Sequence, residues 1–312
     1  MRISGESFTV MEPVLHPEPF DDPDFIYQVK WDGVRILSFI KQNGVQLWNK
    51  RNHERSVQYP ELQALDRQIK GWQAILDGEV VVLKNGKPSF PAVMRRDRSA
   101  NQPTIEYMQK LLPIDYMVFD ILSYEGKELL DYPLDYRQKL LADVLEPGER
   151  VHLVDNFSQG TGLFEAIKAQ DLEGVVAKKP SSRYISGKHH KAWFKIKYRR
   201  QQNCVVGGYT LRGVTINSLL LGVFQDGRLM YCGKAGTGLN SAEWDELSRQ
   251  LPHLEINASP FANLTEPGRG FHFVIPQLAV KVEFAEWSED IQLRSPVIKG
   301  FVDLSPEACV LN

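Results

Sequence analysis

A lysine ends a short apolar and aromatic run in the segment YQVKWDGVR, residues 27–35. Asp32 and Gly33 interrupt the run directly after this lysine, and Arg35 adds a second cation. An amine is a nucleophile only when it is neutral, so a lysine that attacks phosphorus must lose its proton near neutral pH. Lys30 is therefore either a lysine of a surface turn or a nucleophile, and this short pattern alone does not decide between the two.

Other residues along the chain have types that suit the same chemistry. Glu79 and Glu173 stand beside glycines at the ends of apolar segments, LDGEVV and EGVVAKK. Such residues usually form turns, but a converging pair would hold Mg²⁺ and ribose hydroxyls. Phe119, in YMVFDIL, has the sequence surroundings of a core residue.

Two lysines alternate in the segment WFKIK. A strand places Lys195 and Lys197 on one face. Neighbouring cations and burial lower the pKa of an amine, so these lysines and Arg35 are expected to lower the pKa of Lys30.

Basic residues are concentrated in one part of the chain. The formal net charge is −2, but residues 174–225 contain ten Lys and Arg and no Asp or Glu, so the remainder carries −12. Aromatic residues such as Tyr184 and Trp193 alternate with these cations. We expect a groove that binds a polyanion in preference to an ordinary solvated face.

Composition also bounds the class of protein. The 312 residues are 43% hydrophobic and 24% charged, which is typical of a globular protein of one or two domains. No apolar run approaches the ~20 residues that span a bilayer, and the N-terminus lacks the apolar core of a signal peptide, so we expect a cytoplasmic protein. Cys204, Cys232 and Cys309 are far apart and are expected to be reduced and structural.

Short apolar segments bounded by Gly, Asn and Pro predict strands and hairpins over much of the chain. Helical patterns occur at residues 59–69, 135–145 and 162–170. We expect an α+β domain with mainly antiparallel sheets over residues 1–200. Residues 201–312 predict an all-β domain of the OB-fold type, with one helix at 240–251.

The order of the segments KWDG, NKRN, LDGEVV, YMVFDIL, EGVVAKK and WFKIK resembles the covalent nucleotidyltransferase superfamily, and most closely the ATP-dependent DNA ligases. The resemblance covers nearly the whole chain. The segments SSRYISGKHHKAWFKIK, GKAGTGL and VKVEFAEWSEDIQLRSP are similar to the ligase module of bacterial end-joining ligases and their stand-alone relatives. The expected protein is a minimal ligase of two domains, without polymerase, nuclease or N-terminal DNA-binding modules.

The resemblance implies a reaction in which Lys30 attacks the α-phosphate of ATP, AMP passes to a DNA 5′-phosphate, and a 3′-hydroxyl displaces AMP. Mg²⁺, or Mn²⁺ in its place, would bind Glu79 and Glu173. Phe119 would stack on adenine with Val176 on the opposite face. The residues expected to contact ATP or AMP are Gln28, Asp32, Arg35, Arg51, Glu79, Phe119, Val176, Lys178, Lys195, Lys197 and Arg294. Those expected to contact DNA are Arg35, Arg183, Lys188, Lys191, Arg199 and Arg200.

The chain departs from the ligase pattern in two places. Gln28 stands where the family has an acidic residue, although its amide oxygen is still an acceptor for the adenine amino group. Near the C-terminus Arg294 is retained, but Val302, Leu304 and Ser305 replace the expected charged residues, so self-adenylation is expected to be slow unless Lys299 compensates.

By resemblance, the substrate would be nicked or broken duplex DNA in repair, the partner a Ku-like end-binding protein, and the protein a monomer. Two alternatives remain at this point. One is an RNA ligase or a GTP-using capping enzyme, which share Lys-x-Asp-Gly. The other is a non-catalytic DNA-binding module, which the altered C-terminal segment would favour.

Overall fold

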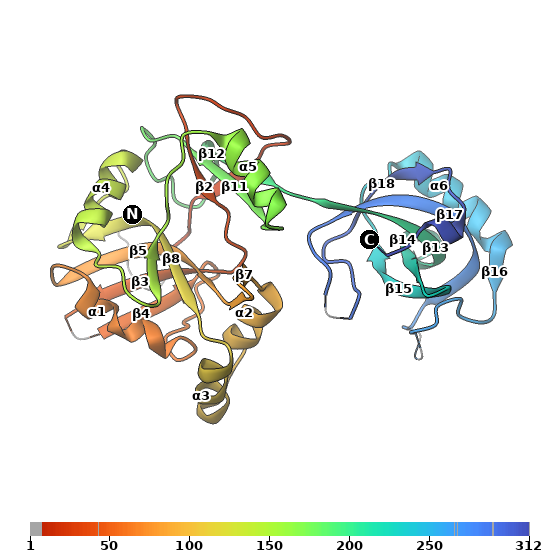
Figure 1. Cartoon of the computed structure of the whole chain (residues 1–312), viewed down its shortest axis with the longest axis horizontal. Helices are drawn as coiled ribbons and strands as arrows, with labels where there is room; N and C mark the ends of the chain where they lie inside the picture. The colour runs from red at the N-terminus through yellow and green to blue at the C-terminus, as the bar shows by residue number, and fades with distance from the viewer. Residues whose placement is uncertain (1–7, 43, 265, 267, 289, 312) are drawn as a thin grey trace. The chain divides into compact units, whose positions relative to one another are not determined.

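The computed structural model describes residues 8–42, 44–264, 266, 268–288 and 290–311. The chain forms two compact units, which divide between Tyr198 and Arg199 (Figure 1). This division lies two residues from the boundary expected from the sequence, and the assignment of separate roles to residues 1–200 and 201–312 stays a prediction. Within the described ranges, no helix has both the length and the apolar character needed to cross a membrane.

The larger sheet of the first unit has six strands, in the order β10-β8-β5-β3-β4 with β9 paired to β8. All neighbours are antiparallel except β10 and β8. This confirms the predicted α+β class with mainly antiparallel pairing. The bounds are β3 Val34–Lys41, β4 Gly44–Asn49, β5 Gln73–Val81, β8 Asp115–Tyr124, β9 Lys127–Glu128 and β10 Val151–Leu153.

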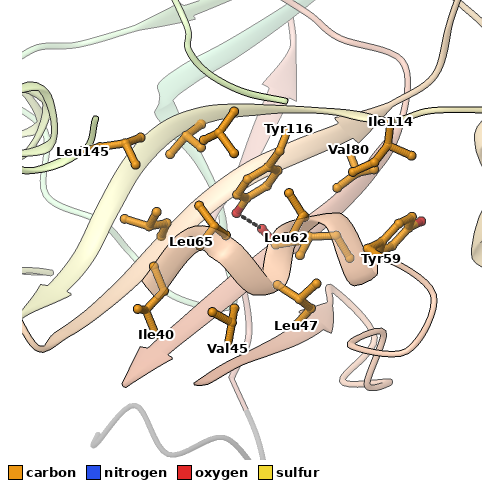
Figure 2. Packing of buried hydrophobic residues seen from close by; sticks show 14 of the residues in the cluster. Ile40, Val45, Leu47, Tyr59, Leu62, Leu65, Val80, Ile114, Tyr116 and Leu145 are labelled. Atoms are coloured by element: carbon orange, nitrogen blue, oxygen red, sulfur yellow. Dashed lines mark hydrogen bonds between the residues drawn. The ribbon is translucent and has the colours of Figure 1, made fainter. Parts of the chain in front are cut away.

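One face of this sheet is covered by a short 3₁₀ helix, Pro60–Ala64, which continues into α1, Leu65–Gln68. Their leucines pack with the inward residues of the strands, and Figure 2 shows Leu62, Leu47 and Tyr116 within this core. All three side chains are fully buried. The Tyr116 hydroxyl donates to the backbone oxygen of Ile36, so the one polar atom of that ring is satisfied inside the core.

A second, smaller sheet of the first unit has the order β1-β12-β11-β2. Its strands are β1 Glu12–Leu15, β2 Ile26–Val29, β11 Gly174–Lys178 and β12 His189–Lys197. β1 runs parallel to β12, and the other pairs are antiparallel. Helix α5, Gly160–Ala169, covers this sheet through Leu163 and Ile167.

The first unit is completed by three further helices, α2, α3 and α4, and by a small hairpin. Helix α4, Leu134–Val144, and helix α5 fall where the helical pattern predicts them. Helices α2, Phe90–Asp97, and α3, Gln102–Leu111, were not predicted. Each has proline in its first turn, a position where proline favours a helix although it usually signals a loop in sequence. The small hairpin comprises β6 Leu83–Lys84 and β7 Lys87–Pro88.

The second unit is built on an antiparallel sheet in the order β15-β14-β13-β17-β16, with β18 paired to β17. The predicted helix is present as α6, Ser241–Gln250, and begins with a capping box between Asn240 and Glu243. All three cysteines are free and buried. The strands are β13 Arg200–Arg212, β14 Thr215–Gln225, β15 Arg228–Ala235, β16 Glu255–Ile256, β17 Phe271–Phe284 and β18 Val297–Val302, and the 3₁₀ turns are Leu251–Leu254 and Pro306–Ala308.

Candidate active site

A cavity of about 770 Å³ opens in the first unit, between the larger sheet and the smaller one. Its walls include residues of β2, β3, β5, β8, β11 and β12 and of the turn that follows β2. It brings together nearly all the residues that the sequence pointed to for nucleotide binding. They are Gln28, Lys30, Asp32, Arg35, Arg51, Glu79, Phe119, Val176, Lys178, Lys195 and Lys197.

Lys30 directly follows β2, and its backbone nitrogen donates to Gly174 of the neighbouring strand. The Lys30 Nζ donates to Glu173 Oε2 at 2.6 Å. The other oxygen of that carboxylate lies 2.7 Å from Lys197 Nζ. Glu173 is thus held between two lysines, 143 residues from one of them in sequence.

The charge state of Lys30 differs from the expectation. Burial acts to lower the pKa of Lys30, but the carboxylates of Glu173, Glu79 and Asp32 outweigh it and raise that pKa above its ordinary value. The predicted lowering was wrong because acidic side chains, rather than Arg35 and the two lysines of β12, carry the charges that dominate around the amine. Burial opposes ionisation of Glu173, yet Lys30 and Lys197 keep the pKa of Glu173 below its usual range.

Lys195 and Lys197 line the same cavity, in agreement with their alternation along one strand. Cross-strand pairing places Lys195 opposite Val176 of β11. Burial, together with the neighbouring Lys197 and Lys30, lowers the pKa of Lys195 below its ordinary value, although Glu12 opposes the shift.

Arg35 has a structural task that the sequence did not reveal. Its Nε and Nη2 donate to the two carboxylate oxygens of Asp77 at 2.9 and 2.6 Å. Its Nη1 donates to the backbone oxygen of Met11 at 2.8 Å, and its Nη2 also donates to the Tyr184 hydroxyl at 3.1 Å. The guanidinium is one-tenth exposed and Asp77 is fully buried. This geometry favours a structural role for Arg35, which links β3 to Asp77 of β5. It makes a role as a ligand of ATP or DNA phosphates less favourable.

Glu79 and Lys178 are the two cavity residues whose pKa values are shifted furthest toward neutrality. Burial raises the pKa of Glu79 to about 8, and the cations Lys30 and Arg35 only partly oppose it. Burial lowers the pKa of Lys178 to about 7. The Lys178 Nζ lies 4.1 Å from the Phe119 ring centre and 4.3 Å from that of Trp193. The ring of Phe119 therefore packs against a buried lysine and also lines the cavity.

Gln28, the residue that replaces an acidic one, is 2% exposed and lies opposite Val176 in the β2–β11 pair. Its Nε2 donates to Asn156 Oδ1 at 2.8 Å. The sequence analysis did not name Asn156 or Asp77, and it named Tyr184 only as an aromatic residue of the basic segment. Asp77 stands two residues before Glu79 in the same LDGEVV segment, so a charged residue within an apolar run was an available signal for it.

The basic segment contributes Lys178, Trp193, Lys195 and Lys197 to the cavity wall, and its contact with a polyanion stays a prediction. Tyr184 and Trp193 are buried in a core cluster with Leu37 and Phe39, so these two rings pack inside the unit rather than on an exposed face. Trp193 also borders the cavity. Lys188 and Lys191 are exposed, and Arg183 is an exposed partner of Asp131 at 3.5 Å.

The remaining predicted residues belong to the second unit. Arg199 and Arg200 begin it, and Arg294 Nη1 donates to Glu286 at 2.8 Å. Lys299, the proposed substitute for the altered C-terminal residues, forms an ion pair with Glu283 at 3.3 Å.

Comparison with known protein families matches residues 11–197 to the ATP dependent DNA ligase domain. Residues 212–303 match the ATP dependent DNA ligase C terminal region. The chain belongs to the ATP-dependent DNA ligase family. The two matched regions correspond to the mixed α/β unit with its cavity and to the antiparallel, OB-like unit, as the sequence predicted.

Relatives of this chain include a multifunctional end-joining protein and a DNA ligase-like protein, both bacterial. It is 31% identical to the multifunctional non-homologous end joining DNA repair protein LigD of Mycobacterium tuberculosis, over 88% of this chain and 35% of that protein. It is 32% identical to the SPbeta prophage-derived DNA ligase-like protein LigB of Bacillus subtilis, over 63% of this chain and 70% of that protein. The chain thus spans about a third of the length of the LigD protein that it matches.

Solved structures are also similar to this chain. A mycobacterial DNA ligase D complexed with ATP and MES is 28% identical, with a TM-score of 0.55 and 98% coverage of both chains. A Lig E DNA ligase, described as binding DNA with a minimal scaffold, is 15% identical with a TM-score of 0.62, over 94% of this chain and all of that one. The second comparison bears on the fold alone.

Proposed function

We propose that this chain seals 5′-phosphate, 3′-hydroxyl nicks in duplex DNA, with ATP as the source of AMP and Lys30 as the residue that carries it. The observation that carries this proposal is the position of Lys30. Its amine lies in a cavity lined by cations and carboxylates and forms an ion pair with Glu173 at 2.6 Å. Membership of the ATP-dependent DNA ligase family supports ATP and DNA as the substrates.

In the first step, Lys30 Nζ forms a bond to the α-phosphorus of ATP while the bond from that phosphorus to the pyrophosphate oxygen breaks. The amine must give up a proton, and the raised pKa of Lys30 makes this loss costly while Glu173 stays beside it. Lys195, Lys197 and the exposed Arg51 supply positive charge along the cavity wall for the triphosphate.

In the second step, a 5′-phosphate oxygen of DNA attacks the phosphorus of the Lys30-bound AMP, and the Lys30 nitrogen leaves. In the third, the DNA 3′-hydroxyl attacks the activated 5′-phosphate and AMP departs. Both steps transfer a phosphoryl group through charged transition states, so the same cations serve each of them.

Asp32 and Glu79 are proposed to face the ribose, and Phe119 with Val176 to enclose the adenine. All four residues line the cavity. Val176 is paired with Gln28 across the β2–β11 ladder, so the adenine site would lie beside the residue that replaces the family's acid.

Two carboxylates fit a magnesium ion that is bound jointly with phosphate: Glu79 in the cavity wall and Glu173, which lies beside Lys30. Mg²⁺ is usually held by one or two carboxylates together with substrate oxygens, and the described residues contain no cluster of three or more potential metal ligands. The Glu173 carboxylate is shared between two lysines, whereas the Glu79 carboxylate accepts no hydrogen bond from the part of the chain that the structure describes. We therefore propose Glu79 as the primary ligand and Glu173 as the second. When bound, Mg²⁺ or Mn²⁺ would offset the phosphate charge.

The test is to incubate the full chain with α-labelled ATP, Mg²⁺ and a nicked duplex. Wild type should form an acid-labile protein–AMP adduct and a sealed strand. Lys30→Ala should form neither, while the control Lys168→Ala, an exposed lysine of α5, should match wild type. An adduct that survives in Lys30→Ala would remove this lysine from the mechanism. The same assay with GTP decides between a DNA ligase and a capping-type enzyme.

The setting of the reaction is also a proposal. The LigD relative is described as an end-joining repair protein, which supports a role in DNA repair. A Ku-like partner, a monomeric state, a cytoplasmic location and contacts of Arg183, Lys188, Lys191, Arg199 and Arg200 with DNA stay predictions. A salt titration of duplex binding tests the DNA contacts, because affinity should fall steeply with ionic strength if these cations meet phosphates.

A further inference from the structure

We propose that a chain of three side-chain amides makes Gln28 a fixed hydrogen-bond acceptor and thereby selects adenine over a 6-oxopurine. This inference rests on the proposed function. The amides belong to Gln28, Asn156 and Gln138, and the chain ends on the backbone oxygen of Phe119. Gln28 would contact the base, and the other two would be positioning residues.

The series of amides has a defined direction because it ends on a backbone carbonyl. Gln138 Nε2 donates to Phe119 O at 3.3 Å, so Gln138 Oε1 faces the other way and accepts from Asn156 Nδ2 at 2.9 Å. Asn156 Oδ1 in turn accepts from Gln28 Nε2 at 2.8 Å. A flip of any one amide would set two oxygens or two NH₂ groups against each other, so the carbonyl favours one orientation for all three, of which Gln28 is buried and Asn156 is exposed.

The backbone explains why Phe119 offers that carbonyl. The pairing between β5 and β8 shifts register where Asp77 faces Asp120 and Gly78 faces Val118, so Phe119 is the extra residue of a β-bulge. A bulged residue is left out of the strand ladder and often lies beside an active site. The side chain of Phe119 lines the cavity, and its backbone oxygen is available to helix α4, where Gln138 stands.

At the other end of the series of amides, backbone hydrogen bonds hold Gln28 beside Asn156. Tyr27 and Phe157 form an antiparallel bridge, with reciprocal backbone hydrogen bonds of 2.9 and 2.8 Å. Their neighbours in sequence, Gln28 and Asn156, are therefore held next to each other. With Nε2 committed, Gln28 has only Oε1 to offer, and no residue within the described ranges donates to that oxygen. Gln28 lines the cavity, so its unused acceptor is the group that a base would meet.

The two classes of purine differ at the position that such an acceptor reads. Adenine carries an amino group at C6, which donates, whereas guanine and hypoxanthine carry an oxygen, which accepts. An amide that was free to rotate could accept from the C6 amino group or donate to the C6 oxygen, so it would bind either class of purine. The family's carboxylate at this position accepts in both orientations, but a glutamine needs its neighbours to exclude the NH₂ end. Asn156 and Gln138 provide that restriction here.

The experiment compares formation of the protein–nucleotide adduct from labelled ATP and labelled ITP, which differ at C6 without the 2-amino group of guanine. In the full chain, Asn156→Leu removes the acceptor for Gln28 Nε2. The ATP/ITP ratio of adduct formation per unit nucleotide concentration should fall about fivefold to tenfold, the value of one hydrogen bond. Asn156→Asp keeps an acceptor for Gln28 and should hold the ratio within about twofold of wild type.

The same substitution in a Gln28→Glu protein distinguishes an effect on the orientation of residue 28 from a general loss of activity. In Gln28→Glu the residue accepts in either orientation, so adding Asn156→Leu should leave the ratio unchanged. An equal loss with ATP and ITP in Asn156→Leu, or the same fall of the ratio in the Gln28→Glu background, would overturn the proposal. Should Asn156→Leu fail to fold in a thermal melt, Gln138→Leu interrupts the next link and must lower the ratio.

The outcomes also distinguish this inference from the proposed function. If wild type forms an adduct with ATP and the ratio is insensitive to Asn156, only the amide chain is refuted. If wild type forms no adduct with either nucleotide, the proposed function and the inference fail together.

Discussion

The ion pair between Arg35 and Asp77 offers a quantitative test of the cavity's construction. Two short hydrogen bonds join the pair, and Asp77 also accepts from the Tyr184 hydroxyl at 2.8 Å. Asp77→Asn keeps the size of the side chain but removes its charge and one of its two acceptors. A buried guanidinium then lacks its counter-charge, which costs about 3–5 kcal/mol of unfolding free energy.

The measurement is urea dependence of hydrogen exchange in peptides of β3 and β5, which reports on the first unit within the full chain. A double-mutant cycle with Arg35→Met should give a coupling free energy of about 1–3 kcal/mol, because the two residues share one interaction. Asp131→Asn is the matched control. It removes a carboxylate from an ion pair whose two side chains are 70% and 90% exposed, and it should leave the exchange unchanged.

The refuting result is a small effect. If Asp77→Asn lowers the unfolding free energy by less than about 1 kcal/mol, and its effect is additive with that of Arg35→Met, the ion pair does not stabilise the link between β3 and β5. Arg35 would then be available to phosphate, as the sequence analysis expected, and binding of nicked DNA by Arg35→Met should weaken while its stability stays near that of wild type.

Three further predictions concern the cavity. Burial raises the pKa of Glu79 to about 8, so the native state binds one more proton than the unfolded state between pH 4.5 and about 8 and loses stability as pH rises through that window. In thermal melts at pH 5 and 9, the loss of stability at the higher pH should be smaller for Glu79→Gln than for wild type. Equal losses of stability would contradict the shift. Because Glu173 helps to raise the pKa of Lys30, Glu173→Gln should move the rising limb of the pH profile of adduct formation to lower pH, whatever its plateau, and an unmoved limb would exclude this coupling. A Cβ on Gly33 would lie 2.2 Å from the Val80 backbone oxygen, so Gly33→Ala should cost about 1–3 kcal/mol in urea unfolding; Gly162→Ala, whose nearest contact is 3.5 Å, is the control, and equal costs would refute the argument.

The sequence predicted the cavity well where each segment carries its own signal. Lys30 stands before a turn, Lys195 and Lys197 occupy alternate positions of a strand, and Glu79 follows a glycine within an apolar segment, so local pattern and family resemblance both apply to them. The two-unit architecture followed from the change in strand content after residue 200. Helices α2 and α3 were missed because a proline in a first turn cannot be told from a loop proline without the surrounding structure.

The failures have a common physical origin in contacts between residues that are distant in the chain. The pKa of Lys30 depends on a carboxylate 143 residues away. The restraint on Arg35 comes from Asp77, 42 residues away, and that on Gln28 from Asn156, 128 residues away. Local sequence records which groups are present, but their ionisation and orientation depend on which of them meet after folding.

The parallel pairing of β1 with β12 has a consequence for synthesis on the ribosome. Glu12 is placed opposite His189, so the first strand of the smaller sheet lacks its partner until nearly 200 residues have been translated. Strand β11 likewise needs β12, and the lysines of β12 complete the cavity wall. Contacts of such long sequence separation carry a large loop-closure entropy and form late. A nascent chain that ends before residue 197 would therefore contain Lys30 but would lack part of the cavity wall that β12 provides.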